Sequence, residues 1–531
     1  MGNSTATPDA IIIGGGHNGL TCAFYLARAG MKVRILEARA IIGGAAVTQE
    51  FHPGFRNSVA SYTVSLLQPK VITDMGLVAR GYRVIERPVS NFLPLPGGDH
   101  LLLGGGLERT QAEFARFSQA DAEALPHYYA MLDRVADVLR DLALRPPPNI
   151  GGGVAGLVEA LTTGRLLARL PREVQRDMLD LFTKSAREFL APWFKSDPVQ
   201  AAFGFDAVVG NYASPDTPGS AYVLLHHVFG EVNGNKGSWG HVIGGMGSIT
   251  RMMAQACAEQ GVEISLNAPV DQVLVENGRA TGVRLASGEE LRAARIIANV
   301  GPKLLYGQMV PRDALPQDFA RRIDGYVCGS GSFRMNVALD RLPDFSALPG
   351  DGEHLRAGIV IAPSLNYMDR AFNDAKAHGW SREPIVEMLI PSIVDDSLAP
   401  PGQHVASLFC QQFDPALEWT PEQEAAAADT IIDTVEAHAP GFRASILGRQ
   451  VLSPRGLERT FGLIGGDIFH GRMSLDQLWA ARPVLGHADY RGPLQGLYMC
   501  GSGTHPGGGV TGAPGHNAAR VVLSDKRWRR G

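Results

Sequence analysis

The sequence has few cysteines, and none of them forms a motif. Its five cysteines, Cys22, Cys257, Cys328, Cys410 and Cys500, are scattered without a C-x-x-C spacing. This absence argues against a dithiol redox centre, a zinc site or a disulfide framework, and it is typical of a reducing compartment. We therefore expect no metal site and no disulfide chemistry.

Long apolar runs and an excess of basic charge are also missing. No segment approaches the roughly 18 uninterrupted apolar residues of a membrane-spanning helix, and residues 1–9 lack the features of a signal peptide. A formal net charge of −4 gives no reason to expect nucleic-acid binding. We expect a cytoplasmic protein with, at most, peripheral membrane contact, and we leave a homo-oligomer open.

Glycine, in contrast, is abundant, and its first cluster has a clear pattern. Gly14-x-Gly16-x-x-Gly19 follows an apolar strand, Ala10–Ile13, and leads into a helical segment. Gly14 permits the tight turn, Gly16 lets backbone amides approach a pyrophosphate, and Gly19 lets the helix pack on the strand. Glu37 ends the second strand, at the spacing of a carboxylate that binds a ribose hydroxyl. This segment predicts a dinucleotide site.

A second match to the same spacing shows how weak the pattern is alone. Gly151-x-Gly153-x-x-Gly156 follows a run of three prolines, with no strand before it. We interpret it as a helix entry or a loop.

A glycine-rich segment near the other end of the chain has a related design, and we expect the two segments to meet around one cofactor. The strand 497–501 is followed by Gly503 and by Gly507–Gly509, and then by a helical run from about Gly515. Successive glycines keep side chains away from a flat ring, and a helix N-terminus stabilises negative charge on it by about 0.3–1 kcal/mol. A glycine-rich hairpin turn is the alternative interpretation.

These segments resemble those of the phytoene desaturase-type flavoproteins, within the wider amine-oxidase-like superfamily. The resemblance rests on residues 9–19, Glu37 with 43–48, 239–250 and 496–519, and it is strongest to the group of pyridine nucleotide-disulphide oxidoreductase domain-containing protein 2. It implies non-covalent FAD, with Glu37 on the adenosine ribose and Val270 at the adenine. The superfamily often has a basic residue where this chain has Ile41, so an arginine contact to FAD is absent there.

Motif and resemblance together predict a set of cofactor-binding residues. These are Gly14, Gly16, His17, Asn18, Gly19, Glu37, Ala38, Gly43, Gly44, Ala45, Ala46, Val270, Gly501, Thr504, His505, Gly508, Gly509 and Val510.

A chain of 531 residues exceeds the size of one hydrophobic core, so two intertwined lobes are expected. The predicted fold class is α/β: a two-lobed, FAD-binding, Rossmann-like fold of glutathione-reductase type, with a discontinuous substrate lobe of mixed sheet and helices. The FAD-binding domain is expected at 8–95, 239–310 and 486–525, and the substrate lobe at 96–238 and 311–485. Within these ranges the patterns predict helices over 120–145 and 155–190 and a strand pair around Asn277-Gly278.

Few residues are candidates for catalysis. His226 and His227, beside an apolar run, could place an imidazole at the flavin, although a hydrogen-bonded core role is the alternative. His505 is expected to be structural or adjacent to the flavin. Arg334, Tyr367 and Arg472 lie in the substrate lobe, but no pattern distinguishes them from salt-bridged surface residues. The leucines of 157–170 could rest on a membrane or line an entrance, and core packing is the preferred interpretation.

The sequence as a whole predicts an FAD-dependent oxidoreductase of the dehydrogenase or desaturase type. Hydride would pass between carbon centres of an apolar, isoprenoid-like substrate and flavin N5, and oxygen or a quinone would accept the electrons. Three alternatives remain open: a flavin amine or alcohol oxidase, a saturase or isomerase that uses reduced FAD, and a non-catalytic flavoprotein that regulates a partner.

Overall fold

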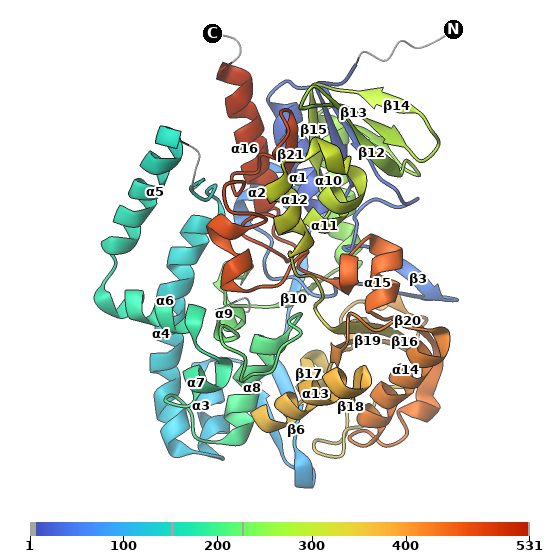
Figure 1. Cartoon of the computed structure of the whole chain (residues 1–531). Helices are drawn as coiled ribbons and strands as arrows, with labels where there is room; N and C mark the ends of the chain where they lie inside the picture. Colours follow the sequence, from blue (N-terminus) through green and yellow to red (C-terminus); the bar gives the residue numbers. More distant parts are fainter. Residues whose placement is uncertain (1–6, 150–152, 226–227, 529–531) are drawn as a thin grey trace.

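The computed structural model describes residues 7–149, 153–225 and 228–528. In Figure 1 a parallel sheet with helices around it occupies the upper part of the molecule. A larger sheet lies in the lower right, and a group of helices covers the left side. Strands of the parallel sheet come from both ends of the chain and from its middle, so the chain passes repeatedly between the two lobes.

The parallel sheet has five strands in the order β11-β2-β1-β15-β21. All neighbouring strands pair in parallel. The central strand alternates between two cores, because Ala10 and Ile12 pack on one face and Ile11 and Ile13 on the other. The strands are β1 (Ala10–Ile13), β2 (Val33–Leu36), β11 (Glu263–Ser265), β15 (Arg295–Ala298) and β21 (Leu497–Met499).

Both faces of this sheet are covered. Three helices pack on one face: α1 (His17–Arg28), α10 (Met246–Glu259) and α16 (Ala513–Trp528). A three-stranded antiparallel sheet packs on the other, formed by β12 (Val270–Glu276), β13 (Arg279–Leu285) and β14 (Glu290–Arg292). The predicted turn between β12 and β13 is confirmed, since Asn277 has φ 51° and Gly278 has φ 74°, as a type I′ turn requires.

The second lobe is built on a seven-stranded sheet in the order β20-β16-β19-β18-β17-β6-β7. Its pairs are antiparallel except β17 with β6, which makes the sheet mixed. The strands are β6 (Asn91–Pro94), β7 (His100–Leu103), β16 (Ser332–Leu339), β17 (Gly358–Ile361), β18 (Trp380–Leu389), β19 (His404–Phe413) and β20 (Ile446–Leu452). Three helices pack beside this sheet: α13 (Leu365–His378), α14 (Pro421–Glu436) and α15 (Pro454–Phe461). Two others, α2 (Pro69–Asp74) and α12 (Gln317–Asp324), pack in the first lobe.

Helices complete this lobe on its left side in Figure 1. The helix expected over 120–145 is present as α4 (Gln119–Ala143), whereas 155–190 contains three helices. Pro171 begins the second of these, and a capping box of Ser185 and Glu188 begins the third. The helices are α3 (Leu107–Ala115), α5 (Gly153–Ala168), α6 (Arg172–Thr183), α7 (Ala186–Leu190), α8 (Asp197–Val208) and α9 (Ala221–Leu224).

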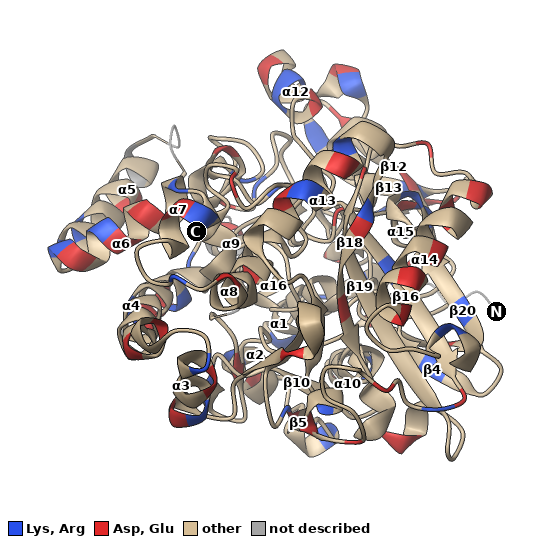
Figure 2. Cartoon of the chain, turned by 90° about the horizontal axis from the view of Figure 1, so that it is seen from below, with Lys and Arg blue, Asp and Glu red and all other residues tan. Residues whose placement is uncertain are grey.

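The expectation of core packing for the leucines of 157–170 is wrong for Leu157, Leu161 and Leu166, whereas Leu170 is partly buried against a hydrophobic core. Leu157 is 60% exposed and Leu161 is 54% exposed. The reason is that α5 lies at the outer edge of the molecule, at the left in both Figures 1 and 2, whereas α6 packs on α4 and α9. Among the described residues, no helix is long and apolar enough to span a bilayer.

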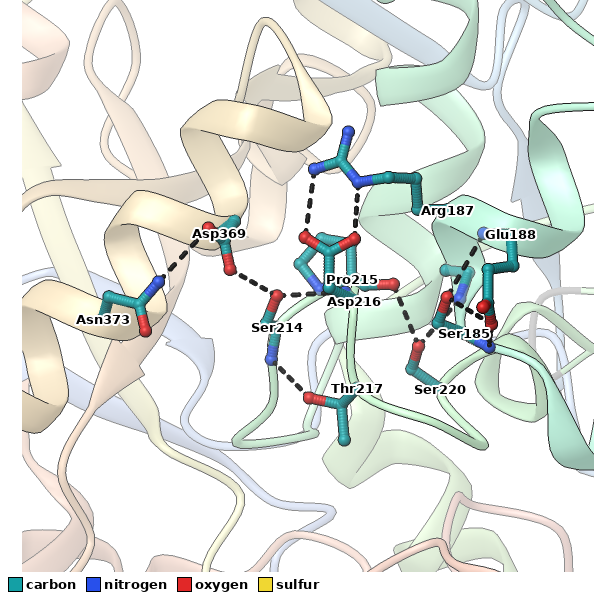
Figure 3. Close-up of polar contacts among 11 residues, drawn as sticks. Ser185, Arg187, Glu188, Ser214, Pro215, Asp216, Thr217, Ser220, Asp369 and Asn373 are labelled. Atoms are coloured by element: carbon teal, nitrogen blue, oxygen red, sulfur yellow. Dashed lines mark hydrogen bonds and ion pairs between the residues drawn. The ribbon is translucent and has the colours of Figure 1, made fainter.

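A polar network fixes the loop that leads into α9 (Figure 3). The Ser214 hydroxyl donates to Asp369 Oδ1 of α13 over 2.6 Å and accepts from the Asp216 amide over 3.0 Å. Arg187 of α7 forms an ion pair with Asp216, and the Ser220 hydroxyl accepts from the first amide of α7. The loop is thereby attached to two helices, which sets the direction of α9.

Candidate functional site

A cavity of about 1010 Å³ extends along the molecule and is lined by both lobes. At one end it is bordered by the glycine-rich turn after β1 and by the end of β2. At the other it is bordered by β16, β18 and β19 and by α4 and α8. We call the first part the nucleotide end and the second part the substrate end.

Backbone dominates the nucleotide end. Gly14 has φ 95°, a conformation that glycine adopts without strain. Gly16 is the extended N-cap residue of α1, and no side chain caps this helix. The first N–H groups of α1 therefore have no capping side chain, which is the arrangement that binds a phosphate group.

Glu37 directly follows β2 and lies on the cavity wall. Its Oε2 accepts from the Gly15 amide over 2.8 Å, and its Oε1 accepts from the Arg39 amide over 2.9 Å. The carboxylate is thus held by backbone at the mouth of the glycine turn. Val270, at the start of β12, lines the same end of the cavity.

The two glycine-rich segments meet in space, as the sequence predicts. His17 Nε2 lies 3.1 Å from the Gly509 carbonyl oxygen, and Asn18 Nδ2 donates to Ser502 Oγ over 3.3 Å. Burial lowers the pKa of His17 to about 4, against the opposing effect of the Gly509 carbonyl. His17 is therefore neutral at physiological pH and adds no charge to this junction.

Most of the predicted cofactor-binding residues lie on the cavity wall. Those on the wall are Gly14, Gly16, His17, Asn18, Glu37, Ala38, Gly44, Ala45, Ala46, Val270, Gly509 and Val510.

The others lie behind the wall and support it. A Cβ on Gly19 would be 2.3 Å from the Gly14 carbonyl oxygen, and one on Gly508 would be 2.1 Å from the Phe469 ring. The Gly43 amide donates to the Gly15 carbonyl, and Thr504 Oγ1 donates to that of Gly501.

The prediction that His226 or His227 is catalytic is not tested by the structure. His226 and His227 lie outside the described residues. His505 is buried behind the wall, with its Nε2 3.1 Å from the Leu142 carbonyl oxygen and its ring against Trp479. That arrangement is a structural role.

The fold and cavity define a class: a two-lobed flavoprotein in which an uncapped helix N-terminus and a glycine-lined wall suit a dinucleotide. Comparison with known proteins agrees. Residues 19–523 match the family described as flavin containing amine oxidoreductase, and the chain belongs to this family. It is an FAD-dependent oxidoreductase. FAD, when bound, supplies a two-electron hydride acceptor, and the residues of the nucleotide end are those that would hold it.

Relatives match nearly the whole chain. It is 42% identical over 542 residues to pyridine nucleotide-disulfide oxidoreductase domain-containing protein 2 of Rattus norvegicus, covering 97% of this chain and 93% of the relative. It is 26% identical to one subunit of the limonene dehydrogenase of Castellaniella defragrans, covering 97% and 94%. The solved structure of putrescine oxidase bound to putrescine has 15% identity and a TM-score of 0.61, covering 98% and 99%, and shares the fold.

The substrate end is lined by side chains. Most of these are apolar or aromatic and belong to α4, α8 and the segment around α9. They include Tyr128, Tyr129, Leu132, Phe203, Phe205, Val209, Leu224 and Val228.

One wall of the substrate end is polar. Arg334 of β16 and Glu387 of β18 are both cross-strand partners of Phe409 of β19, so the three form one row across the sheet. Tyr62 lies over this row: its ring is 4.5 Å from the Arg334 guanidinium carbon, and its hydroxyl donates to Glu387 Oε2. We call these four residues the polar wall.

Sequence reasoning missed most of the polar residues at the substrate end, although two signals were present. Glu387 is the one charged residue in the apolar run 384–394, and Asp206, which also lines the substrate end, follows a run of small and aromatic residues on α8. A lone carboxylate in an apolar segment is costly to bury and points to a function. Nothing in the local sequence marks Tyr62. Arg334, not distinguished from the surface by its sequence, is 1% exposed, whereas Arg472 is exposed beside Asp476.

Proposed function

We propose that this chain is a dehydrogenase of the desaturase type, which removes two hydrogens from a carbon–carbon bond of an apolar, isoprenoid-like substrate. The observation that carries the proposal is the lining of the substrate end, where aromatic and aliphatic side chains surround a cavity continuous with the nucleotide end. Apolar side chains bind a hydrocarbon through the surface that it removes from water.

The comparison supports this substrate class. One relative that matches almost the whole chain belongs to a limonene dehydrogenase, and limonene is an apolar terpene. The amine of putrescine, bound in the solved relative, would need a charged partner. Carboxyl groups that could pair with an amine, such as those of Glu387, Asp206 and Asp133, also line the cavity, so an amine oxidase is the competing function.

The test is anaerobic reduction of the purified, flavin-loaded protein. Limonene and putrescine are mixed separately with it, and the visible flavin absorbance is followed. Bleaching by limonene, with a product that contains one more double bond, supports the proposal. Bleaching by putrescine alone, with peroxide released after oxygen is admitted, supports an amine oxidase. Conversion only after reduction by dithionite supports a saturase or isomerase, and no response to any of these conditions supports a non-catalytic flavoprotein.

We also propose that α5 contacts a lipid surface, from which an apolar substrate and a quinone acceptor would be taken. Leu157, Leu161 and Leu166 are exposed on this helix, Arg165 lies on it beside Leu166, and Arg169 directly follows its end. Exposed leucines beside cationic side chains suit the interface of an anionic bilayer.

Flotation with vesicles of anionic lipid tests this contact. The native protein should float with the vesicles, and the double variant Leu157→Ser, Leu161→Ser should not. Equal flotation of both would contradict it. Oxygen remains the acceptor in the absence of a lipid surface.

A further inference from the structure

The polar wall carries an inference that deepens the proposed function and rests on it. Desaturation removes a hydride from one carbon and a proton from its neighbour, so the site needs a group that takes up the proton. FAD provides for the hydride only. The proton acceptor must therefore be a side chain at the substrate end, or a water held by one.

The wall is built to hold a proton-exchanging pair in one position. Phe409 stacks on the Tyr62 ring with 5.2 Å between the ring centroids, and the Arg334 guanidinium lies against the same ring. These two contacts fix the ring, and its hydroxyl then has the Glu387 carboxylate as its partner. Glu387 is 6% exposed and Arg334 is 1% exposed, so bulk water does not compete for either.

Besides burial, three side chains set the charge of Glu387, and they come from different elements around it. Burial raises its pKa, while Arg87, the Tyr62 hydroxyl and Arg334 act in the opposite direction. Across the cavity, burial raises the pKa of Asp206 well above its ordinary value, and the charge of Glu387 raises it further. On balance the pKa of Glu387 is raised, but less than that of Asp206, so Glu387 is the carboxyl that loses its proton at the lower pH.

The position of Glu387 is also fixed on its other side. A Cβ on Gly358 of β17 would be 3.0 Å from Arg87 Nη1 and 3.1 Å from Glu387 Oε1. The glycine therefore leaves room for these two side chains to lie close together. The Tyr62 hydroxyl thus contacts one carboxylate oxygen of Glu387, and Arg87 lies near the other oxygen.

Several other titratable residues that line the cavity are poorer proton acceptors. His17 and His470 line the cavity, but burial lowers the pKa of each to about 4. Glu37 accepts two backbone hydrogen bonds at the nucleotide end, away from the substrate end. The pair of Tyr62 and Glu387 combines access to the substrate end with a carboxyl that a hydrogen bond joins to a fixed ring.

We propose that Tyr62 and Glu387 form the proton-transfer pair of the reaction. As the hydride and its two electrons leave one substrate carbon for FAD, the C–H bond of the adjacent carbon breaks. Its proton goes to the Tyr62 oxygen, and the phenolic proton passes to Glu387 Oε2. The substrate gains one carbon–carbon double bond, and the pair gains one proton, which it returns to water after product release.

The test compares Glu387→Gln and Tyr62→Phe with the native protein in anaerobic bleaching by limonene, over a range of pH. We expect both variants to be slower by about 10²–10⁴-fold, the usual contribution of a positioned acid or base. The native rate should rise with pH as Glu387 ionises, and this rise should be absent from Glu387→Gln. Glu383→Gln is the matched control, because Glu383 is exposed on the same strand. Flavin content and dithionite reduction show whether each variant is intact.

A second measurement requires no substrate. Infrared difference spectra of the flavin-loaded protein should show a carboxylic C=O band that disappears as the pH rises above the ordinary carboxyl range. This band should be lost in Glu387→Gln and retained in Asp206→Asn, whereas a second band, from protonated Asp206, should persist to higher pH and be lost in Asp206→Asn.

The outcomes separate this proposal from the proposed function. If limonene fails to bleach the native protein, the proposed function fails, and the infrared titration alone decides the pair: a missing Glu387 band overturns it. If limonene bleaches the native protein and Glu387→Gln equally fast with the same pH profile, the pair is overturned and the proposed function stands.

Discussion

The nucleotide end and the polar wall of the substrate end are two parts of one cavity built in opposite ways. At the nucleotide end, glycines and backbone amides form the surface, and the important property is the absence of side chains. At the polar wall, four side chains from three strands and a loop form the surface, and their hydrogen bonds and ring contacts define it. We therefore expect substitutions that add atoms to impair the nucleotide end, and substitutions that remove side-chain atoms to impair the polar wall.

The largest effect is expected at the nucleotide end. A Cβ on Gly16 would lie 2.9 Å from Asn299 Nδ2, so Gly16→Val adds a branched side chain where the phosphates approach the backbone. We expect a folded protein that no longer retains flavin, with binding weakened by about a thousandfold or more, a loss of about 4 kcal/mol or more. The ratio of visible to protein absorbance after gel filtration measures it. Gly164→Val is the control, because Gly164 is exposed on α5 with no atom within 4 Å of its Cβ position. A yellow, fully loaded Gly16→Val would contradict the assignment of the phosphates to this turn.

Removal of charge from the polar wall should be next in size. Arg334 donates to the Leu408 carbonyl and to the Ser407 hydroxyl, each over 2.8 Å. Burial lowers its pKa to about 10, so it remains charged at neutral pH. Arg334→Met removes the donor of both hydrogen bonds. We expect the free energy of unfolding, measured in urea, to fall by about 3 kcal/mol.

The same variant should change the titration of the wall. Because the charge of Arg334 lowers the pKa of Glu387, its loss should raise that pKa and move the infrared band to higher pH. Arg472→Met is the matched control, since Arg472 is exposed beside Asp476, and it should alter stability by less than about 0.5 kcal/mol. If Arg334→Met were as stable as this control, side chains would not hold the wall together.

The connection between the two lobes should depend on pH. Asp395 follows β18 and accepts from His241 Nε2 over 2.8 Å and from the Gly244 amide, just before α10, over 2.7 Å. Burial alone would raise the pKa of Asp395, but these bonds and that of Ser397 lower it to about 2. A carboxyl with a lowered pKa stabilises the folded state above its ordinary pKa, and this stability is lost as the pH falls towards 2.

Asp395→Asn should therefore remove a pH-dependent contribution of about 2 kcal/mol. Urea unfolding at pH 7 and at pH 3 measures it, and the native protein should lose more stability between the two than the variant does. An identical loss in both would show that the carboxylate does not join the lobes.

The smallest effect is expected where the polar network only orients a loop. Ser214→Ala removes the bond to Asp369 and the one from the Asp216 amide. We expect a loss of about 1 kcal/mol in the free energy of unfolding, with flavin content unchanged. Thermal unfolding followed by circular dichroism measures it. A larger loss, accompanied by loss of flavin, would mean that this loop also supports the nucleotide end.

The fold could be predicted where its signals are contiguous. The strand, glycine turn and helix at 10–28 and the hairpin at Asn277-Gly278 depend on residues next to one another, and each is present. The core packing expected for the leucines of α5 is wrong because helical periodicity shows an apolar face but not whether another element covers it. The contact between His17 and Gly509 was predicted from two local motifs that both suit one cofactor.

The sequence by itself determined the nucleotide end, because a glycine turn at a helix N-terminus acts through its own backbone and needs few distant partners. Tertiary structure alone decided the polar wall. Tyr62 and Glu387 are 325 positions apart, and Arg334, Phe409 and Glu387 share a row only because the register of β16, β19 and β18 places them opposite one another. Register follows from the packing of the whole sheet, and a shift of one residue would turn these side chains to its other face.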